Sequence, residues 1–266
     1  MAITKVTGAL LGNYTGGSAD DTVVVGDGAG DAITSGVDNT FIGDNAGTAT
    51  TSGSDNVAIG NEALAANTTA DRNISIGKSA LAANTVGARN VAVGHQALLT
   101  NVNGSRSVAV GHNALSVQNY SGATDGYNVA VGHEAGAAIT TGQFNTFIGG
   151  LAGDANTTAG SNTGLGYAAL GANTTGANNT ATGVNAMAIN TTGTKNVAVG
   201  EQALYANTTA SYNAAVGYDA LRANTTGANN TAVGYKALDA NTEANNNTAL
   251  GYYALAANTT GTLNTA

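Results

Sequence analysis

Three histidines occupy one position of a repeating pattern, and their side chains are the ones best suited to metal chemistry. His95, His112 and His133 each directly follow a glycine in three consecutive repeats. Imidazole nitrogens are common metal ligands. If several copies of the chain were arranged around a common axis, their histidines could together bind a metal ion. Elsewhere the same position holds Asp27 or Lys78. A position that accepts either charge is typically exposed to solvent. We expect an exposed histidine ladder, with these residues as weak metal candidates.

The same position carries tyrosine towards the end of the chain, as Tyr218, Tyr235 and Tyr252. Aromatic side chains in a row can form a strip that contacts sugars, because each ring joins an apolar body to a polar tip. Stacking of the rings on one another explains the row equally well. The three tyrosines are therefore candidates for contact with a glycan.

No other group of residues indicates catalysis. The segment 26–31, Gly-Asp-Gly-Ala-Gly-Asp, has no lysine and no helix after it, and the nine-residue period of calcium-binding repeats is absent. No nucleophile, base and carboxylate recur together. We expect neither an enzyme nor a cofactor.

The element that must position these side chains is a 17-residue repeat. It is marked by Gly26, Gly43, Gly60, Gly77, Gly94, Gly111, Gly132, Gly149, Gly166, Gly183, Gly200, Gly217, Gly234 and Gly251. Every interval between these glycines has the same length except that from Gly111 to Gly132, which is longer by four. A fixed short period is the signature of a solenoid.

Each repeat has the pattern of one short strand and its turns. The residue before the glycine is a large aliphatic in thirteen of fourteen repeats, alanine stands three after it in all fourteen, and asparagine stands four before it in twelve. Alternating β-branched residues predict a strand, and Asn-Thr-Thr-Gly is turn chemistry. We expect an all-β parallel β-solenoid (β-roll) of fourteen 17-residue coils over residues 21–266, forming a rod on the order of 70 Å. Residues 1–20 are expected to be a cap or attachment segment.

Two repeats indicate how the coil is packed. Phe41 and Phe147 replace the usual alanine two before the glycine, and in the same repeats the usual leucine becomes Gly47 and Gly153. Such an exchange suggests two side chains that share one volume. Both faces of the strand then need cover, with Val or Ile such as Val199 on one side and Ala or Phe on the other. A second copy of the chain would supply the other cover, which predicts a parallel homo-oligomer.

The amino-acid composition limits the classes of molecule that the chain is expected to bind. The chain has a net charge of −8 and only 8 Lys and Arg, so we expect no binding to nucleic acid. There is no proline, which suits long backbone ladders, and no cysteine. No apolar run reaches the ~18 residues of a membrane helix, and the first residues do not resemble a secretory signal. We expect no membrane insertion.

Repeats such as Asn-Thr-Ala-Val-Gly-Tyr-Lys-Ala-Leu, joined by Asn-Thr-Thr-Gly-Ala-Asn, resemble the β-roll repeats of trimeric autotransporter adhesin heads. They resemble still more closely the repeat arrays of bacteriophage tail-fibre proteins. The opening segment, Met-Ala-Ile-Thr-Lys-Val-Thr, is similar to the start of phage fibre proteins. The resemblance covers residues 21–266. It implies a homotrimeric fibre of the virion that acts in host attachment or as a spacer. Other virion or fibre proteins would contact its N-terminus, and a host surface glycan is a further possible partner.

Two alternatives stay open. An adhesin head on a bacterial cell surface would need a signal, a stalk and a membrane barrel, and the missing signal favours the phage fibre. Threonine-rich solenoids can also bind ice, although adjacent threonines such as Thr225 and Thr226 point to opposite sides.

The many Asn-x-Thr triplets match the glycosylation pattern, but we interpret them as turns and asparagine ladders.

The one irregular interval predicts a loop. The four extra residues fall near residues 118–127, while the strands before and after keep the pattern, so the surplus must leave the stack. Loops on rigid scaffolds often bind partners, and this one carries Tyr120 and Tyr127. We expect either a tolerated insertion or a lateral contact with a host glycan or a neighbouring fibre protein.

Overall fold

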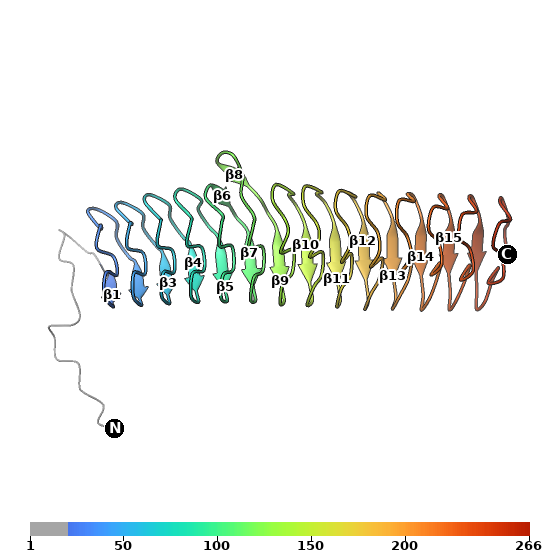
Figure 1. Cartoon of the computed structure of the whole chain (residues 1–266), viewed down its shortest axis with the longest axis horizontal. Helices are drawn as coiled ribbons and strands as arrows, with labels where there is room; N and C mark the ends of the chain where they lie inside the picture. The colour runs from blue at the N-terminus through green and yellow to red at the C-terminus, as the bar shows by residue number, and fades with distance from the viewer. Residues whose placement is uncertain (1–20) are drawn as a thin grey trace, which may run out of the picture. The chain divides into compact units, whose positions relative to one another are not determined.

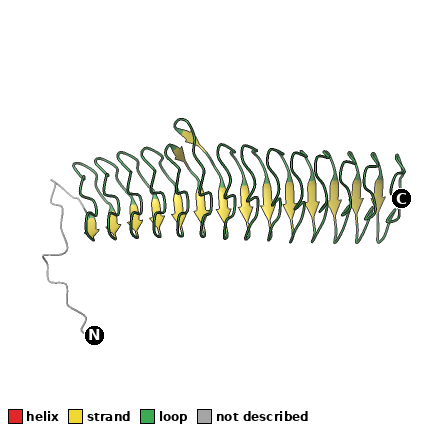
Figure 2. Ribbon diagram, viewed as in Figure 1, coloured by secondary structure: helices red, strands yellow, loops and turns green. Residues whose placement is uncertain are grey.

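The computed structural model describes residues 21–266, so the expected cap or attachment segment at 1–20 lies outside the described residues. The described chain is a parallel β-solenoid of about 13 turns that consists of strands and turns without a helix (Figures 1 and 2). The described residues divide into two compact units, 21–126 and 127–266. No helix that could cross a bilayer is found in residues 21–266.

In the first unit, six three-residue strands form one parallel ladder. They are β1 (Val23–Val25), β2 (Thr40–Ile42), β3 (Val57–Ile59), β4 (Ile74–Ile76), β5 (Val91–Val93) and β7 (Val108–Val110). Each strand pairs with the next at an offset of one full repeat, as Val57 does with Ile74. A second, two-stranded ladder joins β6 (Gly104–Ser105) to β8 (Thr124–Asp125).

In the second unit, eight strands continue the same pattern. They are β9 (Val129–Val131), β10 (Thr146–Ile148), β11 (Thr163–Leu165), β12 (Thr180–Thr182), β13 (Val197–Val199), β14 (Ala214–Val216), β15 (Thr231–Val233) and β16 (Thr248–Leu250). The offset between paired strands is again one repeat throughout. The predicted strand in every repeat is thus confirmed.

The middle residue of each strand points into the coil. Ala198 has no exposed surface, whereas its neighbours Val197 and Val199 are 40% and 36% exposed. The aliphatic residue before the glycine thus lies on the outer side of the coil, and its cover by a second copy stays a prediction. The interior of a 17-residue coil is narrow, and alanine at the centre of the strand leaves space for the leucine that follows the glycine. The valine and isoleucine columns form the outer face of the sheet.

The rest of the interior comes from the alanine and leucine after the glycine, which are buried throughout the inner repeats. The shared-volume prediction is confirmed. A Cβ added at Gly47 would lie 2.7 Å from the ring of Phe41, and one at Gly153 would overlap the ring of Phe147. The two repeats that have glycine but no phenylalanine bury an isoleucine instead, Ile33 or Ile139. Each turn therefore contains one large side chain, drawn from one of three positions.

Gly153→Leu should destabilise the protein by several kcal/mol, because the new side chain and Phe147 would compete for one volume. Phe147→Ala alone should cost about 3–5 kcal/mol through the cavity it leaves. The double variant recreates the pairing of Ala198 with Leu204 and should recover most of the loss. Thermal or chemical unfolding of the three variants measures this, and purely additive losses would contradict a shared volume.

Buried asparagines form a ladder beside the strands. Asn196 is typical: its backbone N–H donates to Oδ1 of Asn179 at 3.0 Å, and its Nδ2 donates to the carbonyl of Ala210 at 2.8 Å. Its own Oδ1 accepts the N–H of Asn213 at 2.9 Å. The side chain thus satisfies backbone groups that the tight turn leaves without partners, which explains asparagine at this position.

A second asparagine ladder runs beside the first, because Asn179 and Asn190 both donate to the carbonyl of Gly193. Asn190 donates from Nδ2 to Oδ1 of Asn173 at 2.7 Å and to the carbonyl of Gly193 at 3.1 Å. This column includes Asn67, so the interpretation of the triplets as asparagine ladders is confirmed. At one turn Ser107 and Gln118 replace both asparagines. Gln118 Nε2 lies 3.1 Å from Ser107 Oγ, so the longer side chain compensates for the shorter one.

Candidate functional site

An aromatic column lies on the surface of the second unit near its C-terminal end. The rings of Tyr218 and Tyr235 stack at 5.4 Å between centroids, and those of Tyr235 and Tyr252 at 5.3 Å. Planes within 9° and 15° of parallel mean that the flat faces largely cover one another. A sugar that stacks on an aromatic face therefore finds few faces free, and this column offers ring edges and hydroxyl groups instead.

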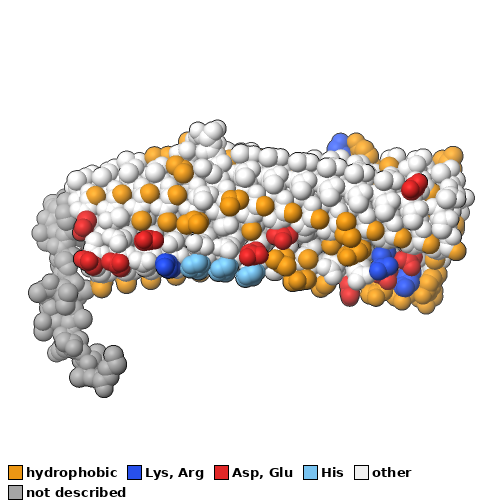
Figure 3. Space-filling model, in the orientation of Figure 1, with side chains coloured by type: hydrophobic (Ala, Val, Ile, Leu, Met, Phe, Trp, Pro, Cys, Tyr) orange, Lys and Arg blue, Asp and Glu red, His pale blue; other side chains and the backbone are white. Residues whose placement is uncertain are grey.

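The aromatic column is held by neighbours from adjacent turns. Tyr253 meets Tyr252 edge to face at 4.6 Å, and the Lys236 ammonium lies 5.9 Å from the Tyr235 ring centre. Figure 3 shows hydrophobic, basic and acidic side chains gathered at this end of the second unit. Cation–π and edge contacts of this kind favour a fixed, ordered stack.

A buried carboxylate underlies this end. Asp219, 5% exposed, lies 3.5 Å from both the Arg222 and the Lys236 nitrogens. Burial raises the pKa of Asp239, and the charge of Asp219 adds to the rise. Burial lowers the pKa of Lys236, but the negative charges around it, Asp239 first, outweigh this and raise the pKa. The cluster is an internal charge network that supports the aromatic column.

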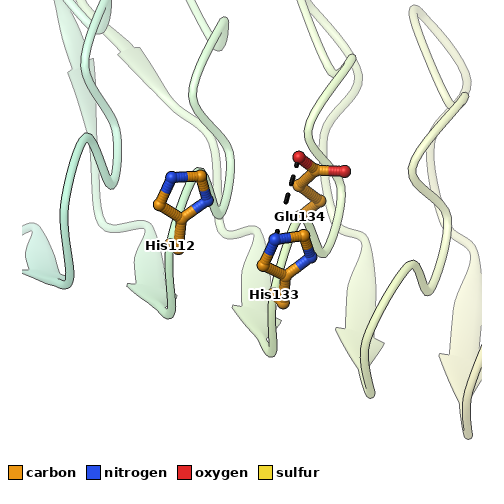
Figure 4. Close-up of side chains that lie close together, drawn as sticks. All are labelled: His112, His133 and Glu134. Carbon is orange, nitrogen blue, oxygen red and sulfur yellow. Dashed lines mark ion pairs between the residues drawn. The ribbon is translucent and has the colours of Figure 1, made fainter.

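The histidines are exposed, as expected. In the first unit His95 and His112 stack at 5.2 Å with planes 8° apart. In the second unit His133 Nε2 lies 3.9 Å from Oε1 of Glu134, the next residue (Figure 4). Within either unit of the described chain by itself, no three ligand atoms from His, Cys, Asp or Glu come together. The metal hypothesis stays a prediction.

The expected loop is present in the first unit. Residues 121–123 are exposed and the segment protrudes at β8 (Figure 1). Tyr120, however, is only 4% exposed: its ring packs against Gly104 and its hydroxyl against Gly126. A ring that fills space under its own loop offers little surface to a partner, and a contact through Tyr120 stays a prediction. Tyr120 anchors the loop.

Tyr127 belongs to the second unit and is 47% exposed. Its ring stacks on that of Phe144, itself 56% exposed, at 5.8 Å. Sequence reasoning singled out Tyr127 but missed Phe144. The spacing of exactly one repeat between the two aromatics was the signal that could have found it.

Sequence reasoning also missed a column of arginines in the first unit. Arg72, Arg89 and Arg106 stand five residues before the recurring glycine in three successive turns, one repeat apart. Stacked turns place such residues about 5 Å apart, where like charges in water repel by about 1 kcal/mol per pair. A protein with so few basic residues has no structural need to align three of them.

The first threonine of most Thr-Thr pairs is bonded within the solenoid. The hydroxyl of Thr174 donates to the carbonyl of Thr191 at 3.0 Å, and that of Thr191 to Thr208 at 2.9 Å. The same bond recurs in both units, for example from Thr51 to Thr68 at 3.0 Å. The first-threonine hydroxyls are therefore bonded to the solenoid itself, whereas the second threonines, such as Thr175 and Thr192, are exposed. The ice-binding alternative stays untested.

No family model, curated protein or solved structure matches this chain.

Proposed function

We propose that the chain is a structural segment of a homotrimeric fibre, most consistent with a bacteriophage tail fibre that acts in host attachment or as a spacer. The observation that carries the proposal is the outer face of the parallel sheet. It exposes large aliphatic side chains in both units, among them Ile42, Ile74, Ile148, Leu165, Val199 and Val216. Parallel sheets are normally covered on both faces, and an exposed apolar stripe indicates a partner surface.

A second copy of the chain is the simplest cover, because an identical repeat presents the same apolar column at the same spacing. The number three and the assignment to a phage fibre rest on the resemblance of the repeats to tail-fibre arrays and trimeric adhesin heads. The parallel stacking of turns within each unit fits a fibre, since every added repeat lengthens the stack by one strand spacing of ~4.8 Å.

Sedimentation equilibrium of the purified chain tests the assembly directly. We expect the mass of a trimer of the 25.8 kDa chain, and a stable folded monomer would overturn the proposal. Electron microscopy of phage particles labelled with antibody to this chain tests whether the chain is located on the phage tail. Label on the tail supports a fibre, and label on bacterial envelopes supports the adhesin head instead.

Val199→Asp should dissociate the oligomer and lower the melting temperature strongly, whereas Lys195→Asp should do neither. In the chain alone Val199 is 36% exposed, so a carboxylate there would be solvated and cost about 1 kcal/mol or less. Buried against a second copy, an unpaired charge costs several kcal/mol. Equal mass and equal melting for both variants would show that the outer face of the sheet is not an interface.

A further inference from the structure

The arginine column, Arg72, Arg89 and Arg106, holds three of the eight basic side chains of the whole chain. All three lie in the first unit, at one position of three successive turns, and their backbone N–H groups bond to the preceding turn. The backbone therefore fixes the three side chains at regular intervals along the direction in which the turns stack.

The outer arginines already have partners. Arg72 Nε lies 3.5 Å from Oδ2 of Asp55, one turn earlier, and Arg106 pairs with Asp125 of β8, in the inserted loop. The central Arg89 is exposed and makes no ion pair within residues 21–266. The column thus has one open guanidinium between two that are engaged by exposed carboxylates. All of these groups are accessible to a ligand.

We propose that the arginine column binds an acidic polysaccharide through its carboxylate or sulfate groups. The guanidinium groups match such groups with paired N–H donors. The anions would bind Arg89 first and then replace Asp55 and Asp125 on the outer arginines. The choice of a glycan rests on the proposed attachment function, while the charge of the glycan follows from the column itself.

The surroundings argue against other occupants. The residues directly before the three arginines are Asp71, Ala88 and Ser105, so the column lacks the apolar centre of a protein interface. A net charge of −8 opposes a nucleic acid, whose phosphates need a broad basic surface. A polymer with spaced charges and many hydroxyl groups fits a short basic row among small polar residues. Binding of this kind should weaken steeply with salt.

Isothermal titration at low ionic strength tests the proposal with three probes: polygalacturonate for carboxylate, dextran sulfate for sulfate and plain dextran as the uncharged control. Arg89→Gln should weaken binding of the acidic polymer at least tenfold. The matched control is Lys195→Gln, which removes one exposed charge at the same repeat position in the second unit. It should leave affinity within twofold. Whichever acidic polymer binds identifies the group recognised.

Asp55→Asn supplies a test of opposite sign. It frees Arg72 from its competing carboxylate and should tighten binding severalfold, a gain that damage to the fold would not produce. Absence of binding to both acidic polymers would overturn the proposal, as would equal losses in the Arg89 and Lys195 variants. Tighter, Arg89-dependent binding of single-stranded DNA would assign the column to nucleic acid instead. Because trimer mass is measured separately, failure here leaves the fibre proposal intact.

Discussion

Asn179→Leu is expected to destabilise the protein by about 1–3 kcal/mol in the free energy of unfolding. Asn179 is fully buried, and its Nδ2 donates to the carbonyl of Gly193 at 2.8 Å. Its Oδ1 accepts the backbone N–H of Asn196 at 3.0 Å. Leucine has a similar size but leaves the backbone N–H of Asn196 buried without a partner, at about 1–3 kcal/mol. The carbonyl of Gly193 loses one of its two side-chain donors and keeps the bond from Asn190 Nδ2.

The adjacent residue provides the matched control. Asn178 is exposed, with a φ of 61°, and the same repeat position holds Phe144 and Leu263 at φ of 60° and 61°. Asn178→Leu should therefore cost about 1 kcal/mol or less. Chemical denaturation of the two variants gives the comparison. Losses of similar size would mean that the asparagine ladder contributes no more than the surface does.

Gly183→Ala should cost at least about 3 kcal/mol, and the matched comparison is Gly176→Ala in the same turn. Gly183 has a φ of 131°, a conformation that residues with a side chain rarely adopt. A Cβ there would lie 2.5 Å from the carbonyl oxygen of Gly200, one turn later. The clash is with backbone of the next strand, so relief would require the ladder itself to separate.

Gly176 occupies a position that accepts alanine elsewhere. Ala70, Ala159, Ala210 and Ala244 stand there, each followed one turn later by glycine, as Gly176 is by Gly193. Its φ is not positive, although a Cβ on its present backbone would lie 2.3 Å from the carbonyl oxygen of Gly193. The four alanines show that this turn can adjust to a Cβ, so Gly176→Ala should cost less than Gly183→Ala. Thermal melts of both variants decide the point. An undisturbed Gly183→Ala protein would show that the recurring glycine is not required by the turn geometry.

The period alone predicted most of the fold, because a 17-residue repeat with one aliphatic strand signal leaves few ways to stack. The exchange of Phe147 with Gly153 could be predicted as well, since both partners vary together within one turn. Which face of the strand points into the coil could not be predicted. In Val197–Val199 both valines lie on one side and alanine on the other, and hydrophobicity favours burying the valines. The interior instead takes the alanine, because Leu204 fills the remaining space, and sequence does not reveal that width.

The surface was harder to predict than the core. The tyrosine column was found because identical residues recur, yet its ring faces are covered by one another, which only coordinates show. Tyr120 was assigned to a contact because it lies in a loop, while the structure buries it under that loop. The arginine column was overlooked because each arginine was considered as an isolated charge. Aligning exposed positions at the repeat period, as was done for histidine, would have found it.

The asparagine ladders have a consequence for how this protein can change in length. Each side-chain bond between turns joins a residue to its counterpart 17 positions away, as Asn162 joins Asn179 and Asn179 joins Asn196. Loss or duplication of a whole 17-residue repeat within the second unit would bring equivalent asparagines together again and restore these bonds between turns. Slippage between such similar coding segments would thus yield shorter or longer molecules that still fold. The length of the solenoid can therefore change in steps of one whole turn. Selection can act on this length without a loss of the hydrogen bonds that hold neighbouring turns together.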